Sequence, residues 1–367
     1  MARGALPYQE LIALQEAGFL SGFEPDSFQP ASVDASITGE IYRLLGGILP
    51  YYGENIRDLL KWSSLFRQDS SKPLEAGESY LCKVKEGVRL PKEIYSYSNP
   101  KSSAGRNDIQ VRLLADGVPR FDSVPAGFEG ELWVLVSSKH FPLKLSEGDR
   151  VTQLRIFDRN TRFDETEMRI VYGKHSLLYR PDGRPLRYDE LKISDNDGSL
   201  ILTLDLETSD IVGYEAKPVG QTPVLVFSQK GHRVEDFWQP IERPGSGIVV
   251  LKQGRFYIFY TLERPIVPIE FAAEMVPMDE RSGEFRSHYA GFIDPGWGCG
   301  RERSEKGWPL VLEVRPFDDN LIIRHNQPIC KLKYERVRQE PEKVYGETGS
   351  NYTFQRGAML SKHFRPV

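Results

Sequence analysis

The sequence predicts an all-β protein made of two similar modules, and three observations support this fold class. Glycine (32) and proline (25) recur at short intervals along the 367 residues, with short runs of β-branched and aromatic residues between them. Short strands bounded by turn residues are typical of a β-sandwich or β-barrel. Few segments show helical periodicity. Several strings of the first half also return in the second half, in the same order.

The individual elements follow from local patterns. Helices are expected at residues 7–17, where Leu11, Ile12 and Leu14 have roughly helical spacing, and at residues 54–62. Apolar runs predict strands at residues 131–136, 200–206, 247–251, 256–260 and 309–314.

Internal similarity predicts the domain organisation. LEAGESYL (74–81) resembles LKQGRFYI (251–258), and EGDRVTQLRIF (147–157) resembles HNQPICKLKY (325–334). Residues 121–136 and 292–314 each place an aspartate before a glycine-rich turn and an apolar strand. A period of about 175 residues is too long for a solenoid and fits two copies of one domain. Chance similarity between β-hairpins is the alternative, and the shared order of the strings argues against it.

We therefore predict modules at residues 1–158 and 198–367, joined by a polar, charge-rich segment at residues 159–197.

Composition excludes several classes of function. The net charge of −4 does not favour binding to nucleic acid or to an anionic membrane. No apolar run reaches the roughly 18 residues of a membrane helix, and the N-terminus has no cleavable signal pattern. Cys82, Cys299 and Cys330 are isolated in the sequence, which indicates a reducing compartment. We expect a cytoplasmic protein.

The string KSSAGR, at Lys101–Arg106, is suited to binding phosphates. Ser102 and Ser103 can donate hydrogen bonds, the Ala-Gly pair lets backbone amides approach, and Arg106 offers a bidentate guanidinium. An ordinary solvated turn is the alternative for such a string.

Two further segments of the second half are candidates for chemistry. Glu313 follows an apolar run, and an inward-facing carboxyl there would be desolvated, with its pKa raised into a range useful for acid–base catalysis. Alternation along a strand could instead turn Glu313 to solvent. The tail at residues 345–363 is rich in glycine, serine and aromatic residues, so it is either disordered or a lid over a ligand.

Five strings together resemble the dCTP deaminases of the dUTPase superfamily: QPASVD (29–34), KSSAGR (101–106), AGFIDPG (290–296), VLE (311–313) and QPIC (327–330). The resemblance implies two fused modules, each a distorted jelly-roll β-barrel. It implies hydrolytic deamination of dCTP to dUTP and ammonia by attack of water on C4, without zinc and with Mg²⁺ accompanying the triphosphate. It also implies a homo-oligomer with sites between modules.

The resemblance assigns roles residue by residue. Lys101, Ser102, Ser103 and Arg106 match the phosphate-binding loop, and Ser102 would also act near the reacting water. The remaining assignments concern the second half: Ala290 for holding the water, Asp294 for the deoxyribose, Val311 to Glu313 for the cytosine edge, Glu313 as catalytic proton shuttle, and Tyr345 and Gln355 for further nucleotide contacts. Asn351 stands where a lysine is usual in that tail.

Each half departs from the family pattern in a different way. Leu135 takes the position of the catalytic glutamate in the first half, and the second half has MDERSGEFRSHY (278–289) without a copy of the loop. We therefore expect a composite site, with phosphates bound by the first module and chemistry carried by the second. An insertion at residues 299–307 lies near this site in the sequence and has no predicted role.

Other functions were weighed against this one. Zinc-dependent deamination needs an H-x-E element and a P-C-x-x-C pair, and the sequence has no such pair. A dUTP pyrophosphatase could use Asp294 to activate water, but Trp297 follows where that pattern places a tyrosine. A bifunctional enzyme with both activities, or a non-catalytic nucleotide-binding regulator, stays open.

Overall fold

The computed structural model describes residues 3–191, 193–279, 282, 285–286 and 290–365, and the chain divides into two compact units. The N-terminal unit consists of Leu6–Arg159, Lys217–Phe237 and Ser361–Val367. The C-terminal unit consists of Met1–Ala5, Asn160–Ala216 and Trp238–Leu360. Two segments from the second half of the sequence therefore belong to the N-terminal unit.

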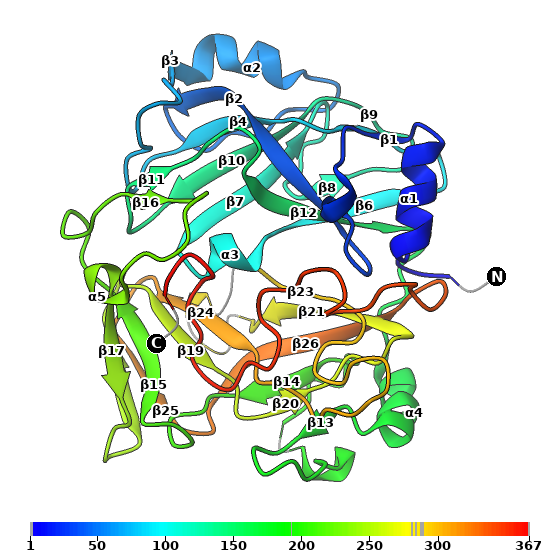
Figure 1. Cartoon of the computed structure of the whole chain (residues 1–367), viewed down its shortest axis with the longest axis vertical. Helices are drawn as coiled ribbons and strands as arrows, with labels where there is room; N and C mark the ends of the chain where they lie inside the picture. The colour runs from blue at the N-terminus through cyan, green and yellow to red at the C-terminus, as the bar shows by residue number, and fades with distance from the viewer. Residues whose placement is uncertain (1–2, 192, 280–281, 283–284, 287–289, 366–367) are drawn as a thin grey trace. The chain divides into compact units, whose positions relative to one another are not determined.

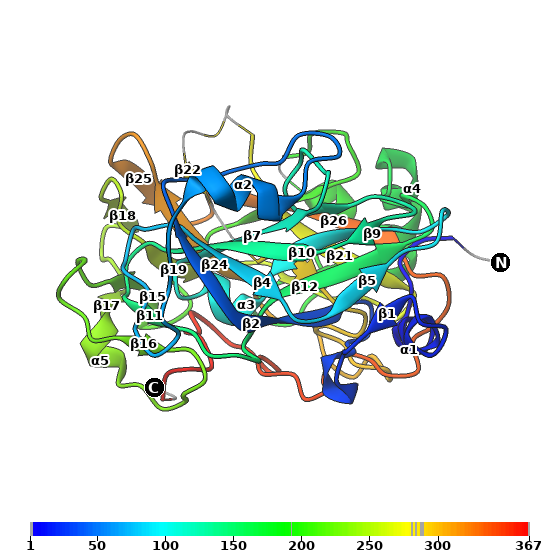
Figure 2. The same ribbon diagram turned by 90° about the horizontal axis from the view of Figure 1, so that it is seen from above.

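The N-terminal unit is a β-structure with short helices (Figure 1). Its helices are α1 (Tyr8–Glu16), η1 (Pro25–Ser27), α2 (Ile56–Ser63), α3 (Ser102–Gly105) and α5 (Val234–Phe237). Its strands are β1 (Leu20–Ser21), β2 (Val33–Leu44), β3 (Ser64–Arg67), β4 (Tyr80–Val84), β5 (Gly87–Arg89), β6 (Tyr95–Pro100), β7 (Ile109–Ala115), β8 (Ser123–Val124), β9 (Glu129–Gly130), β10 (Leu132–Ser138), β11 (Leu143–Lys144), β12 (Arg150–Phe157) and β16 (Leu225–Val226). The main sheet has the order β7-β10-β4-β2-β12-β6-β8, with the long strand β2 at its centre (Figures 1 and 2).

The C-terminal unit repeats this arrangement with two separate sheets. Its helices are α4 (Glu165–His175) and η2 (Tyr188–Glu190). Its strands are β13 (Leu178–Tyr179), β14 (Leu200–Thr203), β15 (Ile211–Ala216), β17 (Trp238–Glu242), β18 (Ile248–Leu251), β19 (Tyr257–Tyr260), β20 (Arg264–Pro265), β21 (Phe271–Pro277), β22 (Phe285–Arg286), β23 (Phe292–Ile293), β24 (Val311–Pro316), β25 (Leu321–Arg324) and β26 (Pro328–Arg336). The sheet orders are β17-β15-β19-β24-β22 and β14-β26-β21-β23.

The registers of the strands show how the two units correspond. In the N-terminal unit Leu81 lies opposite Leu135, and in the C-terminal unit Ile258 lies opposite Glu313. The tyrosine before each of these strand positions accepts a hydrogen bond from the amide five residues earlier. The distances are 3.0 Å from Glu75 N to Tyr80 Oη and 2.8 Å from Lys252 N to Tyr257 Oη. The similarity between LEAGESYL and LKQGRFYI is therefore a structural repeat.

A glutamate that binds a serine or threonine of a neighbouring strand recurs in the same way. Glu86 accepts hydrogen bonds from the amide and the hydroxyl of Ser36, at 2.8 and 2.6 Å. Glu263 accepts the same pair of bonds from Thr203, at 2.7 and 2.8 Å. Burial raises the pKa of both carboxyls, because it disfavours the charged form of each. The same energetically unfavourable feature therefore occurs once in each unit.

The predicted all-β fold class is confirmed: the described part of the chain is mostly strands with few short helices. The two predicted helices are α1 and α2, and each predicted strand segment contains a strand. Helix α4 lies within residues 159–197, where the composition predicts a polar joint and no helix. Its signals are a capping box between Asp164 and Glu167 and the spacing of its buried residues Met168, Val171, Tyr172 and His175.

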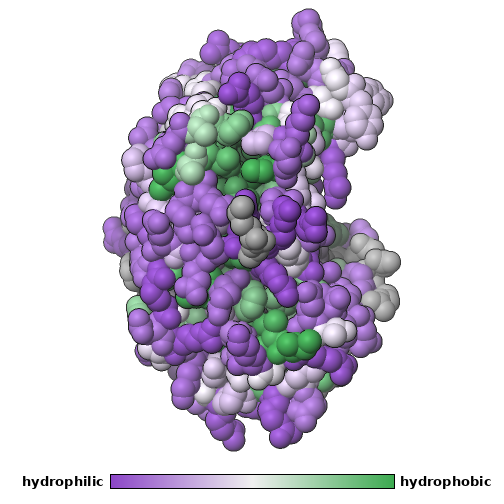
Figure 3. All heavy atoms as spheres, turned by 90° about the vertical axis from the view of Figure 1, so that its right-hand side faces the viewer, coloured by the Kyte–Doolittle hydropathy of each residue, from purple (hydrophilic) through white to green (hydrophobic). Residues whose placement is uncertain are grey.

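The surface and the cysteines fit the composition. The three cysteines are buried and form no disulfide. The face drawn in Figure 3 is largely hydrophilic, with separate smaller hydrophobic areas. Within the described ranges, no helix has the length and apolar character needed to cross a membrane.

Candidate active site

The KSSAGR segment, called the KSSAGR loop below, is a compact connection in the N-terminal unit whose residues Ser102–Gly105 form the single-turn helix α3. It begins where β6 ends, and the Lys101 carbonyl accepts hydrogen bonds from the amides of Ala104 and Gly105, at 2.8 and 3.0 Å. The Lys101 amide is itself bound to the carbonyl of Val151 on β12, at 3.0 Å. These bonds fix the loop to the main sheet.

The side chains of this loop are largely buried, unlike those of a solvated turn. Arg106 is 5% exposed and Ser103 is 2% exposed, while Ser102 is partly exposed. The Lys101 ammonium contacts the carboxylate of Asp34, which is buried. Ser103 Oγ is buried and has no hydrogen-bond partner among the described residues. An unpaired buried hydroxyl is costly, and a bound ligand with acceptor oxygens would satisfy it.

Glu313 faces the interior of the C-terminal unit. It lies on β24 and is 2% exposed, so the alternative of a solvent-facing glutamate is wrong. Its Oε2 accepts a hydrogen bond from the amide of Ala290 at 3.0 Å. The structure thus brings together two residues that the sequence resemblance assigned to the reacting water.

The glycine-rich turn at Asp294 packs against the C-terminal tail. Gly296 has φ +91°, and a Cβ there would lie 2.9 Å from Val344 Cβ. The amide of Tyr345 donates to the carbonyl of Pro295 at 2.8 Å, and the Tyr345 ring centroid lies 4.8 Å from that of Trp297. Through these contacts the start of the tail is an ordered part of the unit.

Gln355 and Val311 lie at the start of β24. Gln355 is 2% exposed, and its Nε2 donates to the carbonyl of Pro309 at 2.6 Å. Its Oε1 is buried without a hydrogen-bond partner in the described part of the chain. Val311 is buried at the first position of β24. Asn351 is exposed.

The insertion at residues 299–307 holds the tail. Its ends meet where the Gly307 amide donates to the Gly298 carbonyl at 2.8 Å. Arg301 donates to the carbonyls of Pro341 and Glu342, at 3.3 and 3.0 Å. No role for this insertion is predicted from the sequence, and these bonds show that it anchors the segment that leads to Tyr345.

The predicted residues therefore form two groups, one in each unit. The N-terminal unit gathers Lys101, Ser102, Ser103 and Arg106. The C-terminal unit gathers Ala290, Asp294, Val311, Glu313, Tyr345 and Gln355.

The strand registers show which residues of one unit occupy the positions of the candidate site residues in the other unit. Leu135 corresponds to Glu313, as the sequence predicted. Val124 lies opposite Ser96, and Ile293 lies opposite Ala273 at the matching position of β21, so Pro125 corresponds to Asp294. The sequence similarity had matched Asp122 with Asp294, which is wrong by three residues.

The position that corresponds to the start of the KSSAGR segment is acidic in the C-terminal unit. β6 ends at Pro100 and β21 ends at Pro277, so Lys101 and Ser102 correspond to Met278 and Asp279. The Lys331 ammonium lies 3.3 Å from the Asp279 carboxylate and also contacts Asp195. The rest of the string at 278–289, on which the predicted absence of the loop depends, lies mostly outside the described residues.

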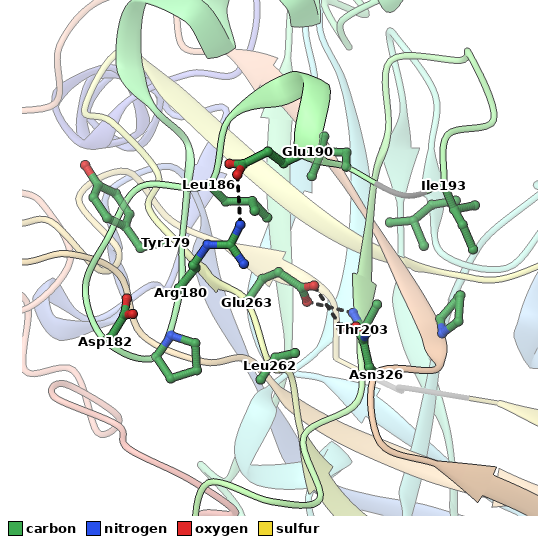
Figure 4. Close-up of a pocket in the computed structure, with 14 residues that line it drawn as sticks. Tyr179, Arg180, Asp182, Leu186, Glu190, Ile193, Thr203, Leu262, Glu263 and Asn326 are labelled. Carbon is green, nitrogen blue, oxygen red and sulfur yellow. Dashed lines mark hydrogen bonds and ion pairs between the residues drawn. The ribbon is translucent and has the colours of Figure 1, made fainter.

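A cavity of ≈ 370 Å³ in the C-terminal unit contains none of the predicted site residues (Figure 4). Glu263 lies in its wall with both carboxylate oxygens bound to Thr203, and Arg180 pairs with Glu190 at 3.1 Å. Because Glu263 repeats the structural role of Glu86, we attribute it to the fold. Across the described ranges no cluster of three or more histidine, cysteine, aspartate or glutamate side chains could hold a metal ion.

Comparisons with known proteins assign each half of the chain to a domain of one protein family. Residues 2–160 match the N-terminal domain of 2'-deoxycytidine 5'-triphosphate deaminase (DCD), and residues 165–364 match its C-terminal domain. The crystal structure of 2'-deoxycytidine 5'-triphosphate deaminase from Agrobacterium tumefaciens is similar, with 32% identity and a TM-score of 0.82, covering 93% of this chain and 100% of that chain. A dCTP deaminase of Metallosphaera sedula is 28% identical over 130 residues, which are 35% of this chain and 69% of that protein.

Proposed function

We propose that this chain, which belongs to the dCTP deaminase family in its tandem two-domain form, converts dCTP to dUTP and ammonia without zinc, using Glu313 as the proton shuttle. The observation that carries this proposal is the buried Glu313 carboxylate bound to the amide of Ala290 at 3.0 Å. A carboxylate in a solvent-excluded site can accept a proton and donate it again within one reaction.

The proposed chemistry balances as a hydrolysis. Glu313 takes a proton from water as the water oxygen bonds to C4 of cytosine. It then passes this proton to the 4-amino group, whose bond to C4 breaks as the C4 carbonyl forms. The second proton of the water, left on the C4 hydroxyl, moves to N3 of the ring, which gained the electron pair of its bond to C4 when the water added. Ammonia and dUTP leave, and Glu313 is again a carboxylate. Ser102 is proposed to act beside the reacting water.

The residues around Glu313 are proposed to hold the nucleoside. Asp294 would bind the deoxyribose, Val311 would contact the cytosine edge, and Tyr345 and Gln355 would close over the nucleotide. The unpaired, buried Oε1 of Gln355 supports this assignment, because a nucleotide N–H or O–H could donate to it.

The N-terminal loop is proposed to bind the triphosphate. Lys101, Ser102, Ser103 and Arg106 would contact its oxygens, and the unpaired Ser103 hydroxyl supports that use. Mg²⁺ is proposed as part of the substrate, entering with the triphosphate, and no residue of the chain is proposed as its ligand.

One catalytic site is therefore proposed to need both sequence modules. This proposal is supported by the distribution of the candidate residues, because the KSSAGR residues lie in the N-terminal unit and Glu313 with its group lies in the C-terminal unit. A homo-oligomer in the cytoplasm is proposed as the working form. Mixing Arg106→Ala chains with Glu313→Gln chains tests the assembly, because recovered activity would require a loop and a glutamate from different chains.

The activity is tested by incubating the protein with dCTP, dUTP and CTP, with separate assays for ammonia and pyrophosphate. We expect ammonia and dUTP from dCTP. Pyrophosphate with no ammonia would identify a dUTP pyrophosphatase instead, and both products would identify a bifunctional enzyme. Nucleotide binding with neither product would identify a non-catalytic regulator.

A further inference from the structure

We infer that the end of the chain is part of the phosphate site: Lys362 binds the triphosphate, while Ser361 and His363 position the KSSAGR loop. This inference rests on the proposed function of the loop. It adds a cationic ligand that the sequence motif does not contain.

The residues on both sides of Lys362 are bound to the loop. Ser361 Oγ donates to the Ser103 carbonyl at 3.1 Å. Asn107 Nδ2 donates to the same carbonyl at 2.7 Å and lies 2.9 Å from His363 Nδ1. Ser361, His363 and Asn107 are at most 2% exposed. The backbone of Lys362 is therefore fixed beside the loop.

A second segment of the N-terminal unit holds the chain end from behind. The His232 amide donates to the His363 carbonyl at 2.9 Å, and the Arg365 amide donates to the His232 carbonyl at 3.0 Å. The Phe364 ring centroid lies 5.3 Å from that of Phe237, at the end of α5. The last described part of the chain lies beside α5 in both views (Figures 1 and 2).

Lys362 adds its charge to an existing group of cations. Burial lowers the pKa of its half-buried ammonium, and the nearby charges of Lys101, Lys230 and Arg150 lower it further. Asp34 opposes this effect, and Lys362 in turn stabilises the charged form of Asp149. Like charges brought together at a partly buried place repel one another, and a polyanion bound among them would relieve that repulsion.

His363 serves the loop without adding a charge. Burial lowers its pKa to about 3, with Lys362 as the next cause, so the ring is neutral at physiological pH. Its Nδ1 accepts from Asn107 in this form. Of the three tail residues at the loop, Lys362 alone brings positive charge.

The tail composition agrees with this role. The family resemblance predicts a lysine at position 351, where this chain has an asparagine. Asn351 belongs to the C-terminal unit. Lys362 is the only lysine between Tyr345 and Arg365.

Lys362→Met tests the ligand role in the full-length protein. We expect the KM for dCTP to rise roughly 10- to 100-fold, as for loss of one charge-assisted bond to phosphate, with kcat changed less than about threefold. Lys362→Arg should recover most of the affinity. Lys230→Met is the matched control, since it removes an exposed cation of the same neighbourhood, and its KM should stay near the wild-type value. An unchanged KM in Lys362→Met, or an equal rise in both methionine variants, would overturn the assignment.

Ser361→Ala and His363→Gln test the positioning role. Both should weaken binding of dCTP several-fold and leave binding of deoxycytidine unchanged, because only the phosphates use the loop. Equal weakening for dCTP and deoxycytidine would mean a general structural role and would contradict the inference.

Calorimetry with inorganic tripolyphosphate separates this inference from the proposed function. We expect the wild type to bind tripolyphosphate and Lys362→Met to bind it at least tenfold more weakly. That result in a protein that releases no ammonia would keep the inference and reject the deamination. Deamination with tripolyphosphate binding unaffected by Lys362→Met would do the reverse.

Discussion

Glu313 and Leu135 occupy matching positions of the two units, opposite Ile258 and Leu81 in their sheets. Asp294 and Pro125 match in the same way. In both pairs the polar residue stands in the C-terminal unit and an apolar residue replaces it in the N-terminal unit. The reverse holds at Lys101, where the C-terminal unit has Met278 followed by an aspartate.

The contacts that build the fold do not differ in this way. Glu86, which is buried, and Glu263, which is partly buried, bind Ser36 and Thr203 through the same pair of bonds. The two tyrosines within the repeated strings accept the same backbone bond. The units therefore share these residues of the fold and divide the residues to which we assign the chemistry.

The largest effect is expected at the position that differs most between the units. Glu313→Gln keeps the shape of the side chain but removes the basic form, so kcat should fall about 100-fold or more, with dCTP binding largely kept. Steady-state kinetics and calorimetry measure both. Glu263→Gln is the matched control, since it changes a partly buried carboxyl of the same unit that we attribute to the fold. It should lower stability and leave kcat near wild type. Near-normal turnover in Glu313→Gln would remove this residue from the mechanism.

Arg106→Ala should act on substrate binding. Loss of a bidentate guanidinium from the phosphate loop should raise the KM for dCTP roughly 10- to 100-fold. Arg112→Ala changes a more exposed arginine of the same unit, paired with Asp122, and should leave KM unchanged. Because Arg106 is buried, thermal unfolding should accompany the kinetics. Equal KM values in the two variants would contradict the assignment of phosphate binding to the loop.

The units should also differ in how their histidines respond to acid. The folded pKa of His363 is about 3, below the ordinary value of 6.5, so the unfolded chain takes up a proton first as pH falls. This contribution to stability is complete above pH 6.5 and is lost toward pH 3, at up to roughly 1.4 kcal/mol per pH unit. His363→Gln should remove that part of the pH dependence of unfolding by urea.

His175 in the C-terminal unit is the matched case. Burial also lowers its pKa, so His175→Gln should change the pH dependence in the same direction, by less. A pH dependence that is identical in the wild type and His363→Gln would show that the His363 pKa is not depressed.

The smallest effect is expected at Leu135. This side chain is half-buried and packs against the cluster that contains Leu81 and Trp133. Leu135→Ala should lower the free energy of unfolding by about 1 kcal/mol and leave both kinetic constants unchanged. Urea denaturation and the dCTP assay measure this, and a fall in kcat would show that the N-terminal unit takes part in the chemistry at this position.

Much of the fold can be predicted from the sequence, because its repeated elements are marked by short local strings. The strings at 74–81 and 251–258 preserve the tyrosine and the spacing that the backbone bond requires, so their correspondence can be seen without coordinates. Helix α4 escaped prediction because charged residues dominate the composition of its segment, although its buried residues keep helical spacing.

Contacts over long distances in the sequence could not be predicted. Asp34 pairs with Lys101 across 67 residues, and Ser361 reaches Ser103 across 258 residues. Nothing in the local pattern of the tail indicates that its end joins the first module. The incorrect match of Asp122 with Asp294 has a related cause. The two segments contain similar residues, but only the strand register shows which residues correspond.

The division of chemistry between the modules is tested most directly by counting dCTP sites in the Glu313→Gln chain, which should bind substrate without converting it. Calorimetry should find one dCTP per chain, with an affinity near the wild-type KM. The double variant with Arg106→Ala should bind it roughly 10- to 100-fold more weakly, because both residues would serve one site. Two dCTP per chain, or an affinity that Arg106→Ala leaves unchanged, would contradict the account.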